Sequence, residues 1–283
     1  MPEHEFELDI TGMSEKDLNS SDLQLICDAA REAGKIALGY FGKDPEVWMK
    51  GGTSPVSEAD HAADKYLCDI LRSARPGYGW LSEETTDNPE RLDCERVFIV
   101  DPIDGTRGFI AGHKKWCVSV AVVDKGKSVC GVLECPALEE TYTALAGEGA
   151  WLNGTRIRAG EVAKQQRITG PDRLIEQYVA AIGEEIESTP FVPSLAYRMA
   201  MVATGELDGT FARANSHDWD IAAADLILGE AGAVLSELNG EEIIYNRKEI
   251  THDILVAGAH QIHAKMLNAA QRAAKINTPE NKG

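Results

Sequence analysis

A short apolar run ending in two closely spaced aspartates limits most strongly how this chain can fold. Residues 97–100 are all β-branched or aromatic, which predicts a short buried strand. Pro102 has a fixed φ and no N–H, so the strand is predicted to stop at Asp101. Gly105 allows a backbone conformation or a close approach that a side chain would block. The pattern therefore predicts a sharp turn that brings the carboxylates of Asp101 and Asp104 into one small volume.

The chemistry of this turn favours a hard cation. Two crowded carboxylates repel each other unless a cation or a proton lies between them. Oxygen ligands suit Mg²⁺, Mn²⁺ or Ca²⁺, and Thr106 adds a hydroxyl beside them. Asp-Pro and Asp-Gly are also ordinary turn dipeptides, so a plain surface turn is the alternative. A covalent mechanism of the haloacid dehalogenase type is excluded, because Pro102 occupies the position of its nucleophilic aspartate.

Composition restricts the class of protein. The chain has 283 residues, of which 43% are hydrophobic and 26% charged, as in a soluble protein of one large or two ordinary domains. A formal net charge of −18 argues against nucleic-acid polymers and anionic membranes as partners. Bound metal ions would reverse that sign locally for an anionic substrate. There is no membrane-length apolar run, signal-peptide pattern or Cys-x-x-Cys pair, which predicts a cytoplasmic protein with reduced thiols.

The first half of the chain has the pattern of an α+β unit. Residues 1–20 are predicted to form a loose arm, and Ser21 to open a helix that ends near residue 41. A flexible loop is expected at residues 50–55, followed by a helix from Glu58. β-Prone segments separated by turns then predict an antiparallel meander up to about residue 155; they are residues 116–123, 128–134, 140–146 and 150–153.

The second half, residues 156–283, alternates helices and short strands and is predicted to be an α/β unit. The predicted helices are residues 172–182, 194–203, 216–226 and 260–275. The predicted strands are residues 209–213, 233–236 and 254–258. His260 and His263 lack acidic or thiol neighbours in sequence, which indicates helix-surface residues rather than ligands.

Other acidic residues have both a chemical and a structural interpretation. Asp60 lies in a first helical turn, where the helix dipole alone favours a carboxylate. Glu83 follows a predicted apolar strand at residues 78–82, although paired glutamates usually form a solvated face. Asp218 and Asp220 open a helix, and either one could simply cap it.

Taken together, four segments resemble the signature set of the inositol monophosphatase superfamily, which are lithium-sensitive, Mg²⁺-dependent phosphatases of small molecules. The segments are Asp60 on an early helix, Ser82-Glu83-Glu84 after a strand, residues 101–106, and Trp219-Asp220-Ile221-Ala222-Ala223-Ala224-Asp225. Residues 147–154 also resemble a strand-turn segment of that family. The resemblance implies a layered αβαβα sandwich and a homodimer.

The resemblance also implies roles for individual residues. One Mg²⁺ is expected on Glu83, Asp101 and the Ile103 carbonyl, and a second on Asp101, Asp104 and Asp220. Glu83 is expected to help hold a third, weaker ion. Thr106, backed by Asp60, is expected to orient and deprotonate the attacking water, with Glu83 counted among the catalytic groups. The expected substrate contacts are Asp104, Gly105, Thr106, Ser194 and Asp220.

The substrate is less closely defined than the reaction. Arg107-Gly108-Phe109 matches neither inositol monophosphatases nor most bisphosphate nucleotidases, and resembles some histidinol-phosphate phosphatases. Residues 194–198 look more like bisphosphate nucleotidases, with Arg198 facing a second phosphate or serving a structural role. The leading prediction is a 3′(2′),5′-bisphosphate nucleotidase with inositol-monophosphate activity. The alternatives are a histidinol-phosphate phosphatase and a catalytically idle regulatory binding protein.

Overall fold

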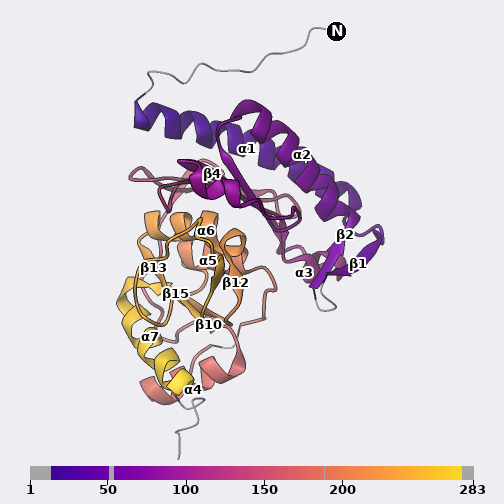
Figure 1. The fold of residues 1–283 in the computed structure, drawn as a ribbon. Helices are drawn as coiled ribbons and strands as arrows, with labels where there is room; N and C mark the ends of the chain where they lie inside the picture. The colour runs from indigo at the N-terminus through magenta and orange to yellow at the C-terminus, as the bar shows by residue number, and fades with distance from the viewer. Residues whose placement is uncertain (1–13, 51–53, 188, 276–283) are drawn as a thin grey trace, which may run out of the picture.

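The computed structural model describes residues 14–50, 54–187 and 189–275, and Figure 1 shows their layered arrangement. Helices α1 (Glu15–Tyr40) and α2 (Glu58–Ala74) cover the outer face of a seven-stranded sheet. Helices α5 (Leu195–Ala203) and α6 (Asp218–Glu230) separate that sheet from a four-stranded one. Helices α4 (Asp172–Ile182) and α7 (His260–Lys275) cover the far side. The predicted αβαβα sandwich is confirmed.

The large sheet contains the predicted meander. Its order is β3-β4-β5-β6-β7-β8-β9; β3 and β4 are parallel and all other neighbours are antiparallel. Lys125 and Gly126 take positive φ angles of 49° and 82° in the predicted β5–β6 hairpin turn. The last strand was not predicted. The bounds are β3 Gly79–Ser82, β4 Arg96–Asp104, β5 Cys117–Asp124, β6 Lys127–Cys135, β7 Glu140–Leu145, β8 Gly149–Leu152 and β9 Thr155–Ile157.

Strand β4 does not stop at Asp101, so that prediction was wrong. The ladder with β5 pairs Asp101 with Ser119, shifts register, and resumes by pairing Asp104 with Cys117. Proline cannot donate to the ladder, but an irregularity absorbs the lost bond without ending the strand. Both aspartates are therefore held by the sheet, one on each side of the irregularity at Pro102.

Helix α1 begins earlier than predicted. Ser14 caps it by accepting a hydrogen bond of 3.2 Å from the backbone N–H of Asp17, and the helix starts at Glu15 rather than at Ser21. The end of the predicted arm is thus helical, and residues 1–13 lie outside the described residues. The acidic sequence of the predicted arm concealed this start. Farther along the helix, Asp22 is buried and pairs with Arg75 at 2.8 Å.

A short hairpin occupies part of the predicted loop at residues 50–55. Strands β1 (Val47–Lys50) and β2 (Ser54–Ser57) are antiparallel, with Met49 opposite Pro55. The prediction was wrong for Lys50, Ser54 and Pro55, which are strand residues, and residues 51–53 lie outside the described part of the chain. The β2 strand leads directly into α2, and Ser57 caps that helix.

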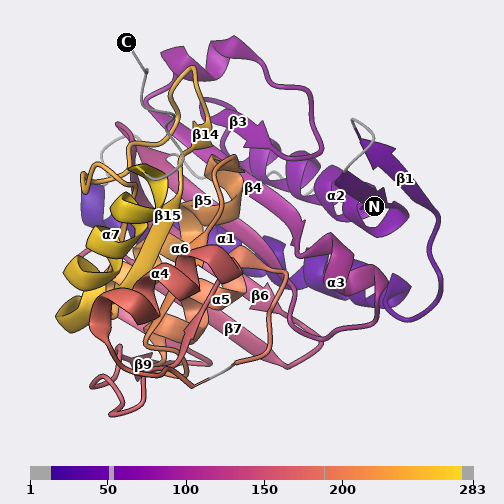
Figure 2. The same cartoon turned by 90° about the horizontal axis from the view of Figure 1, so that it is seen from below.

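The second half contains a mixed rather than a parallel sheet. Its order is β10-β11-β15-β13, with only β10 and β11 parallel. Figure 2 shows α5 and α6 lying across the strands of the large sheet. The bounds are β10 Ile168–Thr169, β11 Gly209–Ala212, β13 Ala233–Ser236 and β15 Leu255–Ala259, with β12 Ser216–His217 and β14 Thr251–His252 forming a separate pair.

Helix α6 lies between the two sheets, and this central position explains why the helix is rich in alanine. Ala222, Ala223 and Ala224 are at most 1% exposed because the helix packs against both sheets. A Cβ atom on Gly131 of β6 would lie 3.0 Å from the Ala223 Cα, so the strand and the helix approach closely. The predicted division into two units near residue 155 stays a prediction.

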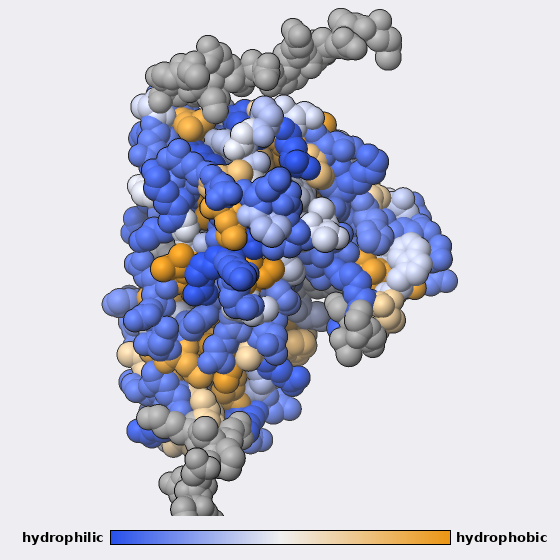
Figure 3. Space-filling view, viewed as in Figure 1, coloured by the Kyte–Doolittle hydropathy of each residue, from blue (hydrophilic) through white to orange (hydrophobic). Residues whose placement is uncertain are grey.

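The remaining sequence expectations have mixed outcomes. All six cysteines are free. His260 is exposed as predicted, but the prediction was wrong for His263, which is half-buried with its Nε2 3.0 Å from the Ser236 hydroxyl. Figure 3 shows a largely hydrophilic face with scattered apolar side chains. Among the helices of the described ranges, none is long and apolar enough to cross a membrane.

Candidate active site

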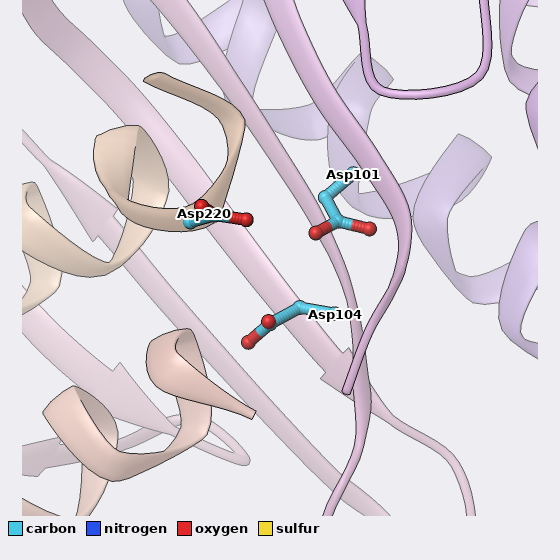
Figure 4. Close-up of side chains that lie close together, drawn as sticks. All are labelled: Asp101, Asp104 and Asp220. Carbon is cyan, nitrogen blue, oxygen red and sulfur yellow. The ribbon is translucent and has the colours of Figure 1, made fainter. Parts of the chain in front are cut away.

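Three aspartates from two distant elements meet between the large sheet and α6. Asp101 and Asp104 come from the end of β4, and Asp220 comes from the first turn of α6. Each offers a carboxylate oxygen, and these oxygens lie within 4.8 Å of one another. Figure 4 shows the three side chains lying close together. The structure thus brings together the aspartates that the sequence predicted as ligands.

The electrostatics of this cluster fit a divalent cation. Burial raises the pKa of Asp101 well above its ordinary value, and repulsion from Glu83, Asp104 and Asp220 adds to the rise. Burial and repulsion from Asp220 raise the pKa of Asp104 to about 7. A bound cation would relieve both the burial cost and the repulsion, and an all-oxygen donor set is the kind that Mg²⁺, Mn²⁺ and Ca²⁺ prefer.

Asp104 is held in place by the start of α5. The Ser194 hydroxyl donates to Asp104 Oδ2, and the backbone N–H groups of Ala196 and Leu195 donate to its two oxygens at 2.7 and 3.4 Å. A carboxylate is favoured there by the unpaired N–H groups and the helix dipole. Ser194 is fully buried, so here it orients Asp104, and its expected contact with substrate stays a prediction.

Gly105 is required by the close approach of β4 to α5. Its φ angle is 97°, a left-handed conformation that disfavours side chains. A Cβ atom on Gly105 would lie 2.9 Å from the Ser194 Cβ and 3.2 Å from the Ser194 backbone nitrogen. Gly105 caps the short helix α3 (Thr106–Ile110), so a helix starts at this turn.

Asp60 and Thr106 form the pair expected for water activation. The Thr106 hydroxyl oxygen lies 3.0 Å from both Asp60 Oδ1 and the Ile103 carbonyl oxygen. The other oxygen of Asp60 accepts from the backbone N–H of Ser57 at 2.8 Å and from the Ser57 hydroxyl at 2.6 Å. Burial raises the pKa of Asp60, and these hydrogen bonds oppose the rise. Asp60 therefore caps α2 and also reaches Thr106.

Glu83 lies next to the cluster rather than within the group of three. It follows β3, and burial together with repulsion from Asp220 and Glu84 raises its pKa to about 8, while Lys50 opposes the rise. The Lys50 ammonium lies 3.6 Å from Glu83 Oε1 and 2.8 Å from Glu84 Oε1. The roles of Glu83 and of the Ile103 carbonyl as ligands stay predictions. Sequence reasoning missed Lys50, which lies in the hairpin read as a loop.

Asp220 and Asp218 have different functions, a distinction the sequence left open. Asp220 Oδ2 accepts a 2.7 Å hydrogen bond from the backbone N–H of His217, so it caps α6 and also faces the cluster. Asp218 is buried and points instead to His252, with Asp218 Oδ1 2.8 Å from Nε2. No sequence motif indicated His252, because it lies far along the chain in a short strand.

A cavity of about 580 Å³ opens beside the aspartates. Asp104 and Asp220 line it together with Arg198, Arg213 and Phe191. Arg198 is not a helix-surface residue, since only 5% of it is exposed. The Arg198 guanidinium donates to the Thr210 hydroxyl at 3.2 Å and the Phe211 carbonyl at 3.0 Å, and it lies 5.1 Å from the Phe191 ring centre.

Comparison with known proteins gives the family. The model of the inositol monophosphatase family matches residues 18–275. The chain belongs to the inositol monophosphatase family. It is 33% identical over 267 residues to an inositol-1-monophosphatase from Mesorhizobium japonicum, covering 89% of this chain and 97% of that protein. It is 32% identical over 261 residues to a Nus factor SuhB from Pasteurella multocida, covering 88% and 95%.

The solved structures of relatives agree with the fold of this inositol monophosphatase family member. The extragenic suppressor protein suhB from Bartonella henselae superposes with a TM-score of 0.78 at 30% identity, covering 89% of this chain and 99% of that chain. Inositol monophosphatases form a phosphatase family, and the aspartate cluster of this chain could hold a metal ion. Family membership and site geometry thus agree on the class of chemistry.

Proposed function

We propose that this chain is a Mg²⁺-dependent phosphomonoesterase that hydrolyses a small phosphorylated metabolite. The observation that carries the proposal is the convergence of Asp101, Asp104 and Asp220 beside a cavity. Asp101, Asp104 and Asp220 would hold one Mg²⁺. Glu83, Asp101 and the Ile103 carbonyl would hold a second, and Glu83 a weaker third; Mn²⁺ and Ca²⁺ are alternative occupants.

The bound ions would neutralise the phosphate, acidify a water molecule and stabilise the attacking and leaving oxygens of an in-line displacement. The chain's own groups position that water. Asp60 accepts a hydrogen bond from the Thr106 hydroxyl, which leaves a Thr106 lone pair to accept a hydrogen bond from the water. The buried Ser57–Asp60 contacts fix the carboxylate that directs Thr106. Backbone N–H groups at Gly105 and Thr106 would donate to phosphate oxygens.

The leaving group would occupy the cavity beside the aspartates, and its lining supports a doubly anionic substrate. Arg198 and Arg213 line the cavity in a chain whose net charge is −18. Arg198 Nε is one of the buried polar atoms in the described ranges that have no hydrogen-bond partner. After a small local shift, this N–H group could donate to an anion. A 3′(2′),5′-bisphosphate nucleotidase with inositol-monophosphate activity fits this lining, and histidinol phosphate is the alternative substrate.

A phosphate-release assay with Mg²⁺ tests the proposal. The substrates are 3′-phosphoadenosine 5′-phosphate, inositol 1-phosphate and histidinol phosphate, with adenosine 3′-monophosphate as the matched compound lacking the second phosphate. We expect turnover that disappears with chelator and a preference for the bisphosphate over the monophosphate. Equal rates on the two adenosine compounds would reject the second-anion site but keep the phosphatase. The absence of turnover on every compound would reject the phosphatase.

A regulatory binding protein is the second candidate, because a relative at 32% identity is named a Nus factor. The intact cluster opposes an idle site, since three mutually repelling carboxylates, two of them buried, are costly without a ligand. The same panel separates the two candidates. We also expect a cytoplasmic homodimer that Li⁺ inhibits; light scattering and a Li⁺ titration of phosphate release check the last two expectations.

A further inference from the structure

His252 is a buried histidine held between two carboxylates. Its Nε2 lies 2.8 Å from Asp218 Oδ1, and its Nδ1 lies 2.8 Å from Glu237 Oε1. The His252 side chain is 0% exposed and that of Asp218 is 1% exposed. The ring of Tyr245 stands edge-on to the imidazole with its centre 6.2 Å away. None of these residues belongs to the aspartate cluster.

The two hydrogen bonds determine the charge of His252. An ionised carboxylate only accepts hydrogen bonds, so both ring nitrogens must donate, and an imidazole that donates twice is a cation. Burial lowers the pKa of His252, but the hydrogen bonds from Asp218 and Glu237 outweigh it and raise the pKa overall. The imidazolium of His252 therefore places a buried positive charge beside Asp218.

This cation fixes the first turn of α6 through Asp218. The second oxygen of Asp218 accepts from the backbone N–H of Asn246 at 2.8 Å, and the Asp218 N–H donates to the Ile250 carbonyl at 3.0 Å. Just before the helix, Ser216 of β12 pairs with His252 of β14. Ser216 and Asp218, which precede Asp220, are therefore held to the loop of residues 245–252 by strand pairing and by hydrogen bonds, respectively.

The same loop also reaches the first half of the chain. Asn246 Oδ1 accepts a 2.7 Å hydrogen bond from Arg91, which lies on the segment that follows β3 and Glu83. The loop therefore contacts the supports of two predicted ligands, Asp220 and Glu83, without contributing to the cluster itself.

We propose that His252 is a positioning residue for the metal site: through Asp218 it holds the start of α6 so that Asp220 faces Asp101 and Asp104. This inference rests on the proposed function in one respect, namely that the aspartate cluster binds a divalent cation. A purely structural role is the competing explanation, because buried ion pairs often contribute stability or specificity without influencing a site.

The test measures metal binding rather than turnover alone. Chelator-treated protein is titrated with Mn²⁺, and free Mn²⁺ is followed by electron paramagnetic resonance, well below the unfolding temperature. We expect His252→Gln to weaken Mn²⁺ binding at least about tenfold, as substitutions behind metal ligands commonly do. In the phosphate-release assay, His252→Gln should need a much higher Mg²⁺ concentration for half-maximal rate than wild type. Its rate at saturating Mg²⁺ should decrease by a smaller factor.

Tyr245→Phe is the matched control. The Tyr245 hydroxyl donates to Asp225 Oδ2 at 2.7 Å, so this variant loosens the same loop from the same helix, but more than a turn beyond Asp220. It should lower the unfolding temperature and leave Mn²⁺ binding within about twofold. His263→Gln, whose hydrogen bonds go to Ser236 and Val256, controls for losing a partly buried histidine.

Each outcome decides a question. Wild-type protein that binds no Mn²⁺ would refute the proposed metal site, and with it the role of His252 in positioning that site. If wild type binds and His252→Gln binds equally well, or if Tyr245→Phe weakens binding as much, His252 is structural only. If His252→Gln does not fold, Asp218→Asn and Glu237→Gln replace it. Asp218→Asn should then weaken binding more than Glu237→Gln, because only Asp218 lies on α6; the reverse order overturns the inference.

Discussion

The two supports of the aspartate cluster are built in different ways. Asp101 and Asp104 lie on a strand of the large sheet, where the backbone ladder with β5 resumes after an irregularity and leaves them 1% and 6% exposed. Asp220 lies at the start of a helix, and its side chain is 22% exposed. Its position depends on side chains, notably Asp218 and the His252 that pairs with it.

This difference suggests how the two halves respond to change. A backbone ladder has many similar bonds, so a single side chain seldom controls its geometry, whereas a helix start held by a few buried polar groups depends on each of them. Asp104 also links β4 to a third element, because its carboxylate accepts hydrogen bonds from the start of α5. The expected effects below range from the loss of the Asp104 carboxylate to the loss of a single capping hydroxyl.

Asp104→Asn should have the largest effect. It removes a carboxylate of the aspartate cluster, and we expect phosphate release to fall by more than about 100-fold, beyond the loss typical of residues behind a metal ligand. Circular dichroism should show an intact fold. Asp69→Asn, an exposed aspartate paired with Lys65 on α2, is the control and should leave turnover unchanged. Near-normal turnover of Asp104→Asn would refute the assigned site.

The stability of chelator-treated protein should decrease as the pH rises from about 5 to 8. The pKa values of Glu83 and Asp104 are raised to about 8 and about 7, so the folded protein keeps protons that the unfolded chain has released. That stabilisation is complete below the ordinary pKa of carboxyls and is lost as the pH passes 7 and 8. Each group contributes up to about 1.4 kcal/mol per pH unit in that window.

Urea unfolding at several pH values measures this dependence. Saturating Mg²⁺ should flatten the decrease, because a cation replaces the protons, and binding at pH 6 should release protons to the buffer. Asp104→Asn should show a shallower decrease than wild type in the absence of metal. Identical slopes for the two proteins would mean that Asp104 does not carry a raised pKa.

Gly105→Ala tests how closely β4 and α5 must approach. A side chain would require a left-handed conformation and would press against Ser194, so we expect a loss of about 2–4 kcal/mol in the free energy of unfolding. Gly112→Ala is matched, since Gly112 has a φ of 75° but no atom within 4 Å of its ideal Cβ. It should lose only about 1–2 kcal/mol. Equal losses would show that the approach is not tight.

Ser194→Ala should have the smallest effect of the four. It removes the N-cap of α5 and one hydrogen bond to Asp104, which should cost about 1–2 kcal/mol of stability and weaken metal binding several-fold. Ser14→Ala removes the N-cap of α1, far from the cluster, and should lower stability slightly without altering metal binding. The cap of α5 has no influence on the cluster if both variants bind metal like wild type.

Much of this molecule could be predicted because local patterns agreed with the final structure. The bounds of α4 and α7 match the helical periodicity, and the meander follows from alternating strands and glycine turns. The errors occurred where the structure accommodates residues that local patterns placed outside an element. Residues 15–20 were predicted to belong to a loose arm but form the start of α1, and Pro102 was predicted to end a strand but lies at an irregularity within β4.

By itself, the sequence determined that Asp101 and Asp104 suit a cation, because two carboxylates crowded at a strand end favour one. The resemblance to the family added Glu83 and Asp220 as expected ligands. The tertiary structure decided which of them meet and what holds them. Asp101, Asp104 and Asp220 converge only after α6 packs across the large sheet. His252 reaches Asp218 from a distant strand. Such contacts have no local signature, because they arise from packing between segments far apart in the chain.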